Sequence, residues 1–165
     1  MVAKELKKMS LTEDLLAATP PLEAKKILFS MAVTEGIGFK GGDRIKGMKT
    51  DFIDVRRAYF HAAAGRRMYF KLPPEDHTDG MCGLVEKSMY GTRDAAQSWE
   101  IEYSQFMNSV GFKRGPGMPC VLYQPLRNLR IVMHADDFTA LGHESQLDWF
   151  RQVIEKNLKS SSEGG

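Results

Sequence analysis

Two aspartates stand side by side between two apolar runs in the segment RIVMHADDFTALG, residues 130–142. The apolar runs have the length and composition of β-strands, and the polar residues between them predict a turn, so the segment indicates an antiparallel β-hairpin. Strands are depleted in aspartate, and neighbouring carboxylates repel each other. Asp136 and Asp137 therefore either lie in an ordinary surface turn or serve as ligands for a metal ion.

A second predicted strand supplies another carboxylate. Around Asp54, the apolar residues Ile53 and Val55 alternate with more polar neighbours, which is the period of a half-buried strand. If this strand lies beside the hairpin, Asp54 comes close to Asp136 and Asp137. Three close carboxylates repel one another strongly, and a hard divalent cation such as Mg²⁺ removes that conflict. Two such ions about 4 Å apart can stabilise the attacking and leaving oxygens of a phosphoryl transfer.

Positive charge gathers around Asp54. Residues 44–71 hold eight basic and two acidic residues, so this segment carries +6 and the rest of the chain −4, within a net charge of +2. Such a segment is either a phosphate-binding face or solvated surface, and charge alone does not decide between them.

The overall composition is that of an ordinary globular chain, and 165 residues predict one domain. No apolar run reaches the roughly 18 residues of a membrane span, and the N-terminus lacks the apolar core of a secretory signal. We therefore expect an intracellular protein, cytoplasmic or nuclear, with no membrane partner. Cys82 and Cys120 are expected to be reduced, and the four histidines form no zinc-binding pattern.

Helical patterns surround these strands. Apolar spacing and capping residues predict helices over residues 10–19, 22–36, 93–111 and 144–158. Strands and turns lie between them. This order predicts an α+β fold, in which an antiparallel sheet has helices packed on one face.

Several motifs follow one another in a recognisable order. They are DVRRAYFHA, RRMYFKLPP, KSMYGTRDAAQSW, SVGFKRGPGMPCVLY and HADDF, after a helix with the sequence PLEAKKILFSMAVTEG. Together they resemble the reverse transcriptase domain of copia-type retrotransposons, which has KSLYGLKQAPRAW and Tyr-Val-Asp-Asp at the matching places. The resemblance runs from about Pro21 to Leu158.

The resemblance implies a polymerase palm-like domain over residues 21–158, with fingers and thumb incomplete. A partly helical N-terminal extension, residues 1–20, would precede it, and a disordered tail, residues 159–165, would follow. Two Mg²⁺ ions, or Mn²⁺ in their place, would bind the catalytic carboxylates. These carboxylates are Asp54, Asp136 and Asp137.

Other site residues follow from the same resemblance. Tyr59 matches the aromatic residue that closes the family's sugar pocket, although it could instead pack in the core. Arg56 and Arg57 could contact the triphosphate or the template backbone, or be exposed. The residues matching template and primer contacts are Tyr90, Gly91, Arg93 and His134.

The chain also departs from the family pattern. His134 replaces the tyrosine before the aspartate pair, which alters the contact with the primer end, and Ala135 replaces a larger residue. Asp94 and Ala96 replace glutamine and proline, and the added negative charge of Asp94 works against phosphate binding. Asp51 is a rival for the first catalytic carboxylate, but it lacks the matching spacing, and we expect it to be solvated.

The resemblance thus implies an RNA-directed DNA polymerase, a nucleotidyltransferase that uses an RNA template, a DNA primer and deoxynucleoside triphosphates. In a longer polyprotein it would work beside ribonuclease H and integrase domains. One alternative is a catalytically inactive retroelement relic that still binds nucleic acid. Another is a small metal-dependent phosphohydrolase that uses the same carboxylates.

Overall fold

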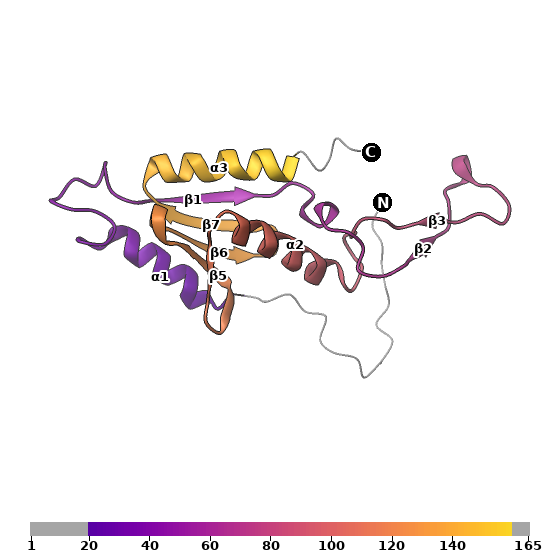
Figure 1. Ribbon diagram of the computed structural model, residues 1–165, viewed down its shortest axis with the longest axis horizontal. Coiled ribbons are helices and arrows are strands. Elements are labelled where there is room, and N and C mark those ends of the chain that lie inside the picture. Colours follow the sequence, from indigo (N-terminus) through magenta and orange to yellow (C-terminus); the bar gives the residue numbers. More distant parts are fainter. Residues whose placement is uncertain (1–19, 160–165) are drawn as a thin grey trace. The chain divides into compact units, whose positions relative to one another are not determined.

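In the computed structural model, which describes residues 20–159, three α-helices and seven strands follow one another along the chain (Figure 1). The elements are α1 (Leu22–Val33), β1 (Lys49–Asp54), the 3-10 helix η1 (Ala58–His61), β2 (Tyr69–Phe70), η2 (Pro74–Asp76), β3 (Gly83–Leu84), α2 (Ala95–Ser109), β4 (Lys113–Gly115), β5 (Met118–Gln124), η3 (Pro125–Arg127), β6 (Leu129–His134), β7 (Asp137–Gly142) and α3 (Glu144–Lys159). The predicted helix at residues 10–19 and most of the predicted tail, residues 160–165, lie outside the described residues.

These elements form two compact units. The larger unit, which we call the sheet unit, comprises residues 20–56 and 104–159, and the smaller one, the ribbon unit, comprises residues 57–103. The chain passes from the sheet unit to the ribbon unit after Arg56 and returns within α2, after Tyr103. None of the described helices is long and apolar enough to cross a membrane.

The sheet unit is built on five antiparallel strands in the order β1-β7-β6-β5-β4. Strands β6 and β7 form the predicted hairpin, with His134 opposite Asp137 at the turn. Strand β1 pairs with β7 along its whole length and ends with Asp54 opposite Asp137. The α+β class and the antiparallel sheet are therefore confirmed.

The structure differs from the prediction in one detail, because helices cover both faces of the sheet rather than one (Figure 1). On one face, Leu141 of β7 packs with Ala24 and Leu28 of α1. On the other face, Phe138 of β7 packs against Phe150 of α3, with ring centroids 5.8 Å apart. Successive residues of a strand point to opposite faces, so these two contacts lie on different sides.

The physical reason for this second layer is the pattern of the central strands. Residues 138–142 of β7 are all buried, as are four of the six residues of β6. Strands covered on both faces are apolar almost without interruption, whereas strands with one solvated face alternate. The runs on either side of the aspartate pair are apolar almost without interruption. This pattern in the sequence therefore indicates a sheet that is covered by helices on both faces.

The ribbon unit consists of η1, a two-stranded antiparallel ribbon of β2 and β3, and the first part of α2. Backbone hydrogen bonds continue the ribbon beyond these short strands, for example from the Val85 N–H to the Met68 carbonyl and from the Ser88 N–H to the Ala62 carbonyl. Trp99 of α2 is buried next to Tyr103, one turn further along the helix, with ring centroids 5.6 Å apart.

The buried ring of Phe138 provides a test of this packing. Truncation in Phe138→Ala should lower the free energy of unfolding by about 3–5 kcal/mol, because the cavity lies between the sheet and α3 and cannot collapse fully. Leu126→Ala is the control, since Leu126 is 94% exposed and its loss should cost no more than about 0.5 kcal/mol. Urea unfolding measures both values, and equal losses would contradict the assignment of Phe138 to the core.

Candidate metal centre

The pairing of β1 with β7 brings two of the predicted carboxylates together. Asp54 is the last residue of β1 and Asp137 the first residue of β7, and they stand directly opposite each other. Opposite residues of antiparallel strands point to the same face, with Cβ atoms roughly 5 Å apart. The side chains of Asp54 and Asp137 therefore lie side by side where β1 ends and β7 begins.

The turn of the β6–β7 hairpin supplies the third carboxylate. Only Ala135 and Asp136 separate the two strands, and Ala135 adopts a left-handed conformation with φ +56°. This conformation costs a non-glycine residue roughly 1–2 kcal/mol. The Val55 N–H donates a hydrogen bond to the Asp136 carbonyl at 3.1 Å, which ties the turn to the end of β1.

The three carboxylates converge. Ligand oxygens of Asp54, Asp136 and Asp137 lie within 4.8 Å of one another, with Asp136 half-buried and the other two exposed. Within residues 20–159, Asp54 and Asp137 make no ion pair. Like charges at this separation repel, and three hard oxygen ligands with access to water fit a divalent cation such as Mg²⁺, which keeps several waters when it binds to protein.

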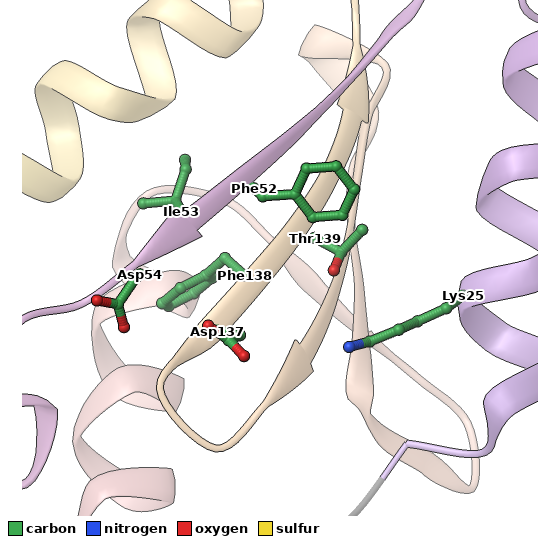
Figure 2. Close-up of a pocket in the computed structure, with 7 residues that line it drawn as sticks. All are labelled: Lys25, Phe52, Ile53, Asp54, Asp137, Phe138 and Thr139. Atoms are coloured by element: carbon green, nitrogen blue, oxygen red, sulfur yellow. The ribbon is translucent and has the colours of Figure 1, made fainter.

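A pocket of about 190 Å³ adjoins these carboxylates on the same face of the sheet (Figure 2). Asp54 and Asp137 line it together with Phe52, Thr139 and Lys25. Figure 2 shows Lys25 extending from α1 toward the strand pair. Lys25 could not be predicted from the sequence, because only the packing of α1 over β1 and β7 brings it to the site.

Asp51, the rival carboxylate, is held on the other face of β1. It accepts a hydrogen bond from Nε of Arg151 in α3 at 2.8 Å, and only 14% of its side chain is exposed. The prediction that Asp51 is solvated is therefore wrong, because α3 covers this face. The same hydrogen bond raises the pKa of the Arg151 guanidinium, with a smaller contribution from Asp148.

The remaining predicted residues divide between the two units. Arg56 and His134 belong to the sheet unit and are exposed, and His134 lies opposite Asp137. In the ribbon unit the structure brings Tyr59 and Tyr90 together, with ring centroids 4.3 Å apart. The ribbon unit also contains Arg57, Gly91 and Arg93.

Asp94 lies in a different environment from the one predicted. It is 7% exposed, at the N-terminus of α2, and its carboxylate lies 3.5 Å from Nε of Arg66. A negative charge at the start of a helix is favourable. The carboxylate of Asp94 is therefore buried within the ribbon unit beside Arg66, and it does not lie on the surface where it would repel a nucleic acid.

The chain is similar to part of a known Pol polyprotein. The retrovirus-related Pol polyprotein from transposon TNT 1-94 of Nicotiana tabacum is 23% identical over 106 residues, which cover 61% of this chain and 8% of that polyprotein. No protein-family model matches the chain, and no solved structure matches it. The similarity supports an origin in a retrotransposon Pol polyprotein, of which this chain spans a small part.

Removing one carboxylate tests the metal site. In wild-type protein, Mg²⁺ at ten times its dissociation constant should add about 1.4 kcal/mol to the free energy of unfolding. In Asp54→Asn this gain should vanish, whereas stability without metal should rise by about 0.2–1 kcal/mol, because one of three repelling charges is gone. Thermal unfolding with and without Mg²⁺ measures both effects.

The matched control for this experiment is Asp76→Asn. Asp76 is an exposed acid in η2, away from the carboxylate cluster in sequence, and its loss should leave the Mg²⁺ response unchanged. A Mg²⁺ response that is the same in wild type, Asp54→Asn and Asp76→Asn would show that the cation binds elsewhere.

Proposed function

We propose that this chain is the palm of an RNA-directed DNA polymerase, a retrotransposon reverse transcriptase that extends a DNA primer on an RNA template. The observation that carries the proposal is the convergence of Asp54, Asp136 and Asp137 at the end of an antiparallel strand pair. The order of the sequence motifs supports the same proposal, and the similarity to a retrotransposon Pol polyprotein supports an origin of the chain in such a polyprotein.

The carboxylates would act as ligands. Asp54 and Asp137, from opposite strands, would hold two Mg²⁺ ions between them, and Asp136 would complete the set from the turn. When bound, such ions lower the barrier to attack by the primer 3′-hydroxyl and neutralise the charge of the triphosphate. Strand β7 is buried over residues 138–142, and β1 pairs with it along its whole length, so the ligands are held in place before substrate arrives.

Basic residues would bind the phosphates. Lys25, which lines the pocket beside Asp54 and Asp137, can contact an incoming triphosphate as a point charge. Arg56 and Arg57, just beyond β1, would contact the triphosphate or the template backbone. Arg56 and Arg57 are exposed and Lys25 is half-buried, and binding of polyanions by such cations weakens as salt concentration rises.

The resemblance assigns sugar and template recognition to residues of the ribbon unit. Tyr59, which packs against the ring of Tyr90, matches the residue that excludes a 2′-hydroxyl in that family. Gly91 and Arg93 would border the template, and in the sheet unit His134 would take the place of the family's tyrosine at the primer end.

Primer extension tests the proposal. The substrate is a poly(rA)/oligo(dT) duplex with dTTP, in Mg²⁺ and then in Mn²⁺. Wild-type protein should extend the primer, and Asp54→Asn and the double variant Asp136→Asn/Asp137→Asn should reduce the rate by about a hundredfold or more, because the developing charge loses its stabilisation.

Asp51→Asn is the matched control for Asp54→Asn. The two aspartates lie on the same strand but on opposite faces, and Asp51 bonds to Arg151 rather than facing the pocket. Its substitution should leave extension within a few fold of wild type. Folded protein that extends no primer in either metal would overturn the polymerase proposal and favour a relic, and phosphate-ester hydrolysis without primer would favour a phosphohydrolase.

A further inference from the structure

An aromatic ring lies exposed beside the carboxylates. Phe52 is 67% exposed, although burying such a side chain normally stabilises a protein by about 1.5–3 kcal/mol. It stands two residues before Asp54 on β1 and therefore points to the same face. Both residues line the pocket described above (Figure 2).

Within residues 20–159, Phe52 has one ring contact. The ring of Phe29 in α1 lies next to it, with centroids 6.2 Å apart and planes tilted by 43°. This contact restricts the motion of the ring while most of its surface stays open to solvent. Ile53, the neighbour on the opposite face of β1, is half-buried instead.

The groups around the pocket are those that a nucleotide needs. Lys25 offers a cation for phosphate, the carboxylates offer a metal site, and Phe52 offers an apolar face. Two residues along a strand span about 7 Å, a separation on the scale of the sugar that joins a phosphate to its base. An apolar peptide or an acyl chain would use the ring but has no charged group for Lys25 or for a metal held by the carboxylates.

We propose that Phe52, supported by Phe29, is a stacking platform for the base of a nucleotide whose phosphates are held by Lys25 and by a cation on Asp54 and Asp137. This inference rests on the proposed metal-dependent function of the same site. Every base has a π-face, so a phenyl ring can stack on both purines and pyrimidines. The larger purines stack more strongly, so the preference between bases is modest. The platform would thus add affinity without reading sequence.

The test compares two ligands in the presence of Mg²⁺, dATP and inorganic tripolyphosphate, which shares the phosphates but has no base. Phe52→Ala should weaken dATP binding about tenfold, within the range of base–aromatic stacking, and leave tripolyphosphate binding unchanged. Phe52→Trp should keep or improve dATP binding. Isothermal titration calorimetry measures these affinities, and circular dichroism verifies that the variants are folded.

Ile45→Ala is the matched control. Ile45 is an apolar side chain of the same unit that is 84% exposed and does not line the pocket, so its loss should change neither affinity. If Phe52→Ala binds dATP as tightly as wild type, while both ligands still bind, the stacking platform is overturned and the metal-dependent function stands. If wild-type protein binds neither ligand in Mg²⁺, both the function and the platform are overturned.

Discussion

The antiparallel register of β1 against β7 determines where the functional side chains point. In this register Asp54 faces Asp137, and Ile53 faces Phe138 on the other side of the sheet. A slip of one residue would turn Asp54 toward α3 and move Ile53 to the pocket face. Because Phe138 is fully buried against Phe150, the hydrophobic core holds the register, and through it the core positions the carboxylates.

The cluster of Asp54, Asp136 and Asp137 lowers the free energy of unfolding, and burial of the neighbouring strands compensates for this loss. Three carboxylates within 4.8 Å repel one another, and Ala135 keeps a left-handed backbone in the turn that carries Asp136. Burial of β6 and β7 on both faces keeps the strands in place despite these costs. A bound cation would remove the repulsion between the carboxylates, which is the physical basis of the metal-dependent function that we propose.

Local patterns in the sequence were sufficient for the hairpin, the strand around Asp54 and the two C-terminal helices. The convergence of the three aspartates also followed, since it needed only the assumption that two strands are neighbours. Contacts between distant elements could not be predicted in this way: the bond from Arg151 to Asp51, the approach of Lys25 to the pocket and the ring pair of Phe29 and Phe52. Each depends on how a helix lies across the sheet, which periodicity does not specify.

The most direct test of the account is to locate the metal. Crystals of the chain soaked with Mn²⁺ and dATP would be measured at the manganese absorption edge. The account predicts two anomalous peaks about 4 Å apart, both within ligand distance of Asp54 or Asp137. Manganese bound only at other sites, with the three carboxylates free of metal while nucleotide is present, would contradict it.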